Sequence, residues 1–89
     1  MKRTASIEWS DFGQLMKRLR EHQNISQTTL ANILGCHRSY VWRLEHAERR
    51  PSKLLLHALN HAFELSHAER DLLETFEQML EYGIEELHR

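Results

Sequence analysis

Apolar side chains recur every three to four residues along nearly the whole of this 89-residue chain, and this spacing constrains its fold more than any other feature. The first such run places Phe12, Leu15, Met16 and Leu19 on one side of a helix, where residues three and four apart share a face. The chain has only three glycines and one proline, which leaves little material for turns. We therefore predict a single, small all-α domain, with a core of modest size.

Residues that begin and end helices divide the chain into segments. Ser10 and Asp11 offer an N-cap for a first helix over about 11–23, and Asn24 can end it in the left-handed conformation. Ser26 can begin a short second helix that Gly35 ends. A third helix follows almost at once and ends near Ala47.

Two further helices are predicted in the second half of the chain. Pro51 disfavours helix in the residue before it, and Ser52 can begin a fourth helix. Ser66 can begin a fifth, which we expect to run to about Leu87. The prediction is therefore five helices, with the last one extended.

Charge is distributed unequally between the two parts of the chain. Up to Lys53 there are ten lysines and arginines against five acids, which gives a net charge of +5. Beyond Lys53 there are two against eight, which gives −6. Such asymmetry suggests that the N-terminal part meets a polyanion and that the C-terminal part has another task.

Residues 27–44 have the features of a helix-turn-helix. Ala31 is small where the two helices would cross, Gly35 permits the positive φ of the turn, and Val41 and Leu44 can fix the second helix to the first. The other side of that second helix is polar, as a helix in the DNA major groove requires. The periodicity alone leaves a DNA reader and a plain helical bundle equally open.

At this point the sequence resembles the Cro and phage-repressor type of helix-turn-helix domain, also called the XRE type, over about residues 12–73. The resemblance rests on Phe12 to Arg20, Ile25 to Ala31, Leu34 and Gly35, Arg38 to Val41, Arg43 to Glu45, and Arg49 to Ser52. It implies a five-helix, lambda-repressor-like fold, a phosphate contact from Gln27, and base reading in the major groove by helix 37–46. By position the readers would be His37, Arg38, Ser39 and Arg43.

The chemistry of these side chains agrees with that assignment. Each guanidinium of Arg38 and Arg43 can form a fork with O6 and N7 of guanine, whereas His37 and Ser39 carry less sequence information. Phosphate contacts are expected from a second set of side chains: Lys17, Tyr40, Arg49, Arg50 and Lys53.

Two other positions correspond to residues that, in the family the sequence resembles, form a partly buried ion pair between the first and third helices. We therefore assign them a structural role. They are Arg20 and Glu45. Four positions depart from the family pattern: His37, Ala47, where glycine is usual, Glu48 and Glu64.

The last predicted helix carries an apolar stripe, which needs a partner. Its upper part, with Leu72, Leu73 and Phe76, can close the domain's own core, and the lower part extends beyond it. We expect a homodimer to form through Phe76, Met79, Leu80, Ile84 and Leu87. Packing of this stripe on its own domain is the alternative. The predicted organisation is thus an N-terminal arm (1–9), a helix-turn-helix domain (10–66) and a C-terminal dimerisation helix (67–89).

The sequence predicts no enzyme, no cofactor and no metal site. His57 and His61 share one helix face, but two ligands do not make a site. Cys36 is the only cysteine, and no signal peptide or membrane span is recognised, so we expect a cytoplasmic protein. The leading prediction is a DNA-binding transcriptional regulator, in particular a repressor that binds double-stranded DNA. The alternatives are an antitoxin-type autoregulator and a protein-interaction module, either of which would use the acidic C-terminal helix to contact a protein.

Overall fold

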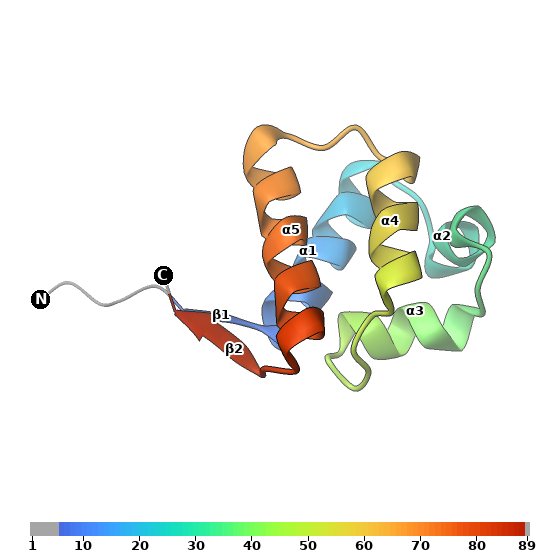
Figure 1. The fold of residues 1–89 in the computed structure, drawn as a ribbon. Coiled ribbons are helices and arrows are strands. Elements are labelled where there is room, and N and C mark those ends of the chain that lie inside the picture. The colour runs from blue at the N-terminus through green and yellow to red at the C-terminus, as the bar shows by residue number, and fades with distance from the viewer. Residues whose placement is uncertain (1–5, 89) are drawn as a thin grey trace, which may run out of the picture.

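The computed structural model describes residues 6–88, which form five helices and a short antiparallel sheet (Figure 1). In chain order the elements are β1 (Ser6–Glu8), α1 (Trp9–His22), α2 (Gln27–Leu34), α3 (Arg38–Glu45), α4 (Lys53–Ala62), α5 (His67–Tyr82) and β2 (Glu86–His88). The predicted N-terminal arm lies in part outside the described residues. Within residues 6–88, no helix combines the length and the apolar character needed to cross a membrane.

Most of the predicted helix boundaries are confirmed. The hydroxyl groups of Ser26, Ser52 and Ser66 each accept a hydrogen bond from a backbone N–H three residues on, which caps α2, α4 and α5. Asn24 and Gly35 take the expected left-handed conformation, with φ of 57° and 71°. These residues satisfy the free backbone groups at the helix ends and let short helices follow one another closely.

The core lies where the apolar sides of all five helices meet. Phe12 of α1 and Phe76 of α5 pack edge to face at its centre, with ring centroids 5.3 Å apart. The largest fully buried side chains are Phe12, Leu15, Met16, Leu30, Val41, Leu44, Leu59, Phe76 and Met79. This core joins α3 to the rest of the domain and fixes which of its sides faces outward.

The first helix begins earlier than the sequence predicted. The N-cap is Glu8 rather than Ser10 or Asp11, and Asp11 is the third residue of the helix. The backbone N–H of Glu8 donates to the Asp11 carboxylate at 2.7 Å, which completes a capping box. This earlier start brings Trp9 into the helix, where its indole stacks on Phe76 with a centroid distance of 5.6 Å.

The prediction that the fifth helix continues to Leu87 is wrong. The helix ends at Tyr82, because Gly83 adopts a left-handed conformation with φ of 64°. The chain then forms β2, which pairs with β1 in the register Ser6↔His88, Ile7↔Leu87 and Glu8↔Glu86. The fold is therefore helical with a two-stranded sheet that joins the N-terminal and C-terminal segments.

Candidate nucleic-acid interface

The turn between α2 and α3 sets the direction of the third helix. After Gly35, the backbone N–H of Cys36 donates to the carbonyl of Ala31 at 2.9 Å, and α3 begins two residues later. Val41 and Leu44 are buried against α1 and α2, which leaves the opposite side of α3 in solvent. In Figure 1, α3 lies at the lower right of the molecule, beneath α2 and α4.

Most of the predicted base readers lie together on this outer side. Arg38, Ser39 and Arg43 are exposed, and with Trp42 and Glu48 they line one shallow hollow. His37 is also exposed, but it precedes the helix as its N-cap residue. The geometry thus presents two guanidinium groups and a hydroxyl group on one turn and a half of a single helix.

The ion pair expected between Arg20 and Glu45 is present. Nε and one terminal nitrogen of Arg20 donate to the two carboxylate oxygens at 2.7 and 3.1 Å, and the pair is largely buried. The hydrogen bond to Glu45 raises the pKa of Arg20 above its ordinary value. The other terminal nitrogen donates to the carbonyl of Ile25 at 3.0 Å, so Arg20 also holds the turn before α2.

Gln27 takes part in the same network, which the sequence did not reveal. Its amide nitrogen donates to Glu45 at 3.1 Å, and the side chain is only half-exposed. The first residue of α2 is thereby tied to the last residue of α3. The amide that was expected to contact phosphate is oriented by this bond.

The basic residues after α3 lie in two different environments. Arg49 lies over the ring of half-buried Tyr40, 5.7 Å from its centroid. Lys53 is exposed at the start of α4. Both residues follow α3 in the chain, and Lys17 is exposed on α1.

Arg50, by contrast, is engaged with the C-terminal segment. Its guanidinium forms an ion pair with Glu85, just before β2, and lies 5.8 Å from the ring centroid of Trp9. Both members of the ion pair are well exposed. The predicted phosphate contact thus has a competing partner within the protein.

Sequence reasoning missed the role of Gly13. A Cβ atom at this position would lie 2.6 Å from the carbonyl oxygen of Leu44 and 2.7 Å from that of Glu45. Only a residue without a side chain allows α1 to approach the end of α3 this closely. A glycine inside an otherwise helical pattern was the available signal.

The structure corrects the predicted dimer surface. Phe76 and Met79 are fully buried in the protein's own core, so they are not available to a second subunit. Leu80, Ile84 and Leu87 are half-buried and pack against the same core. A single chain therefore covers most of the stripe that was assigned to a partner.

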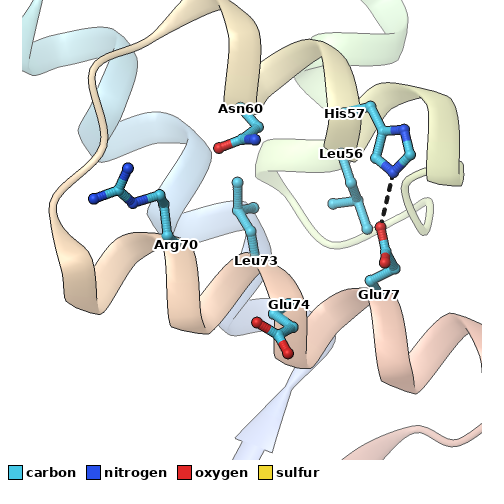
Figure 2. A pocket seen from close by; sticks show the side chains of 7 residues that line it. All are labelled: Leu56, His57, Asn60, Arg70, Leu73, Glu74 and Glu77. Carbon is cyan, nitrogen blue, oxygen red and sulfur yellow. Dashed lines mark hydrogen bonds and ion pairs between the residues drawn. The ribbon is translucent and has the colours of Figure 1, made fainter.

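His57 and Cys36 each lie in a defined local environment. His57 lies in a groove between α4 and α5, where its Nε2 is 2.9 Å from a carboxylate oxygen of Glu77 (Figure 2). Within the part of the chain that the structure describes, no three potential metal-ligating side chains come together. Cys36 is half-buried, and its burial raises the pKa of the thiol.

Five helices with two arginines on the free side of the third define a helix-turn-helix class of fold. The helix-turn-helix domain family matches residues 11–73, which is more than half of the chain. This protein therefore belongs to that family, in its Cro and phage-repressor (XRE) type, a group of DNA-binding domains that are typically not enzymes. No curated protein sequence matches the chain.

Proposed function

We propose that this protein is a sequence-specific transcriptional repressor, which acts in the cytoplasm by placing α3 in the major groove of its operator. The observation that carries the proposal is the position of Arg38, Ser39 and Arg43 on the exposed side of α3, opposite buried Val41 and Leu44. Each arginine can recognise one guanine through O6 and N7. His37 and Ser39 add contacts at the N-terminal end of the helix.

Contacts to phosphate hold α3 in register. The proposed set comprises Lys17, Gln27, Tyr40, Arg49, Arg50 and Lys53. The net charge of +5 up to Lys53 supports this role, because each neutralised phosphate releases bound counterions. Affinity should accordingly fall steeply with salt.

The experiment that tests the function is selection of bound sequences from a random pool of duplex DNA. A repressor with two arginine readers should enrich sites with guanine at two fixed positions in each half-site. Arg38→Ala should then relax the preference at one of these positions, because it removes a base contact worth about 1–3 kcal/mol. Enrichment of no sequence at all would overturn the proposal.

Lys53→Ala serves as the matched control for Arg38→Ala. Both substitutions remove one positive charge from an exposed side chain. Loss of a phosphate contact weakens binding to all DNA sequences alike and reduces the salt dependence of the affinity. Loss of a base contact changes the preference for one base over another. If Arg38→Ala lost the same affinity for every DNA sequence, Arg38 would not be a base-reading residue.

We also propose that the repressor acts as a homodimer that joins through the end of α5. Tyr82 is 72% exposed in the last turn of this helix, next to half-buried Leu80 and Ile84. A two-fold dimer would place two recognition helices about one DNA turn apart. Sedimentation equilibrium of Tyr82→Glu should show dissociation; a monomeric native protein or an unchanged variant dimer would contradict the interface.

A further inference from the structure

A tryptophan lies on the side of α3 that is proposed to read DNA. The side chain of Trp42 is 38% exposed, although it is large and mostly apolar. With Arg38, Ser39 and Arg43 it lines the hollow described above. A ligand that meets these arginines must therefore also meet the indole ring.

The indole ring is held in place by His46. The two rings stack with centroids 3.9 Å apart and an angle of 19° between their planes. Nδ1 of His46 is 2.8 Å from the backbone carbonyl oxygen of Trp42, which can only accept, so Nδ1 carries the proton. One face of the indole is thus covered by a ring that is itself bonded to the helix backbone, while Trp42 as a whole remains 38% exposed.

We propose that Trp42 is a further specificity-determining residue, which recognises the C5-methyl group of thymine in the major groove, and that His46 is its positioning residue. The inference rests on the proposed function, since it requires α3 in the major groove. The base edges in that groove offer hydrogen-bond donors, acceptors and a single apolar group, the thymine methyl. An immobilised indole among polar side chains is suited to that methyl group, whereas the arginines recognise guanine.

The competing role for Trp42 is a contact with the DNA backbone. Its indole N–H could donate to a phosphate oxygen, which would hold the helix in register without reading sequence. The two roles differ in one measurable respect. A methyl contact depends on a single methyl group of the DNA, and a phosphate contact does not.

The test uses DNA in which single thymines are replaced by deoxyuridine, which removes only the methyl group. The dissociation constant of the full chain is measured on the selected operator and on each substituted operator. At one thymine of each half-site the native protein should bind about fourfold more weakly to deoxyuridine, as expected for one buried methyl group. Trp42→Ala should bind the thymine operator more weakly and should not distinguish thymine from deoxyuridine there.

Substitution of His46 tests the positioning role. His46→Ala should reduce the discrimination between thymine and deoxyuridine, because the indole loses its fixed orientation. His46→Phe should retain most of it, because a stacked ring remains. Leu54→Ala is the matched control: it removes an exposed apolar side chain from α4 and should leave discrimination unchanged.

The outcomes separate this inference from the proposed function. A sequence could be selected while deoxyuridine at every thymine changes the affinity of native protein and Trp42→Ala equally. That result would overturn the methyl contact and leave the proposed repressor function intact. A selected operator without any fixed thymine would have the same consequence. If no sequence is selected, both proposals fall together.

Discussion

Arg20 and Glu45 join α1 to the last residue of α3 through a two-pronged ion pair that is nearly sealed from water. Their side chains are 14% and 2% exposed, and the nearest nitrogen and oxygen atoms are 2.7 Å apart. Because Glu45 also accepts from Gln27, one carboxylate connects α1, α2 and α3. The position of the proposed recognition helix therefore depends on this carboxylate.

Glu45→Gln should lower the free energy of unfolding by about 3 kcal/mol, because it leaves the buried guanidinium of Arg20 without its counterion. Urea unfolding followed by circular dichroism measures the change. Arg18→Ala is the control, since Arg18 is an exposed neighbour of Arg20. This substitution should change the free energy of unfolding by no more than about 0.5 kcal/mol. A loss below about 1 kcal/mol for Glu45→Gln would show that the pair does not hold the helices together.

Gly13→Ala should destabilise the protein although alanine favours helix. The added Cβ would press on two backbone carbonyl oxygens, which cannot move aside as a flexible side chain would. The expected cost of about 2 kcal/mol from overpacking exceeds the gain of up to about 1 kcal/mol in helix propensity. Gln14→Ala, an exposed neighbour in the same helix, should be close to neutral. A stabilised Gly13→Ala variant would mean that α1 and α3 can separate without cost.

Ala47→Gly should stabilise the protein. Ala47 has φ of 59°, a left-handed conformation that costs a residue with a Cβ about 1–2 kcal/mol in steric strain, which exceeds the roughly 0.5–1 kcal/mol of conformational entropy that glycine loses on folding. Asn24→Gly is the matched comparison, because Asn24 has φ of 57° but asparagine tolerates this region better. The unfolding temperature should rise more for Ala47→Gly than for Asn24→Gly. The opposite order would contradict the strain at Ala47.

The local parts of the fold were predictable because short-range rules decide them. Ser26, Ser52 and Ser66 cap helices through bonds to residues only three positions away. Asn24 and Gly35 end helices through their own conformation. The exposed side of α3 likewise follows from the spacing of Val41 and Leu44, which are both buried.

The parts that sequence reasoning missed depend on contacts between distant residues. The pairing of Ser6 with His88 joins the two ends of the described chain. A strand of three residues is too short to show a periodicity from which this pairing could be predicted. An apolar stripe at helical spacing shows that a residue such as Phe76 needs a partner. It does not show whether that partner is the same chain or another one.

The terminal sheet should protect Trp9. The indole N–H of this residue donates to the carbonyl of Ile84 at 3.2 Å, and its side chain is buried beside the strands. In a Trp42→Phe background, Trp9 is the only tryptophan and its fluorescence reports on this region. Leu87→Asp should shift the emission to longer wavelengths and lower the unfolding temperature, because a charged group cannot replace the half-buried Leu87 beside Ile7.

His88→Gln in the same background is the control for the terminal sheet, since His88 is exposed on β2. Its emission should match that of the unsubstituted background. If Leu87→Asp also left the emission of Trp9 unchanged, the strands would not be what excludes water from the indole.

Glu85 should weaken DNA binding through its ion pair with Arg50. The pair is exposed and contributes little to stability, but it occupies a guanidinium that is proposed to contact phosphate. Glu85→Gln should therefore raise the affinity for the selected operator by about two- to fivefold, the range expected for the release of an exposed ion pair. Glu81→Gln removes the same charge from an exposed position that has no such pair with Arg50, and so measures the general effect of charge on affinity. In an Arg50→Ala background the two variants should bind equally; a gain for Glu85→Gln that persists there would show that Arg50 is not the residue released.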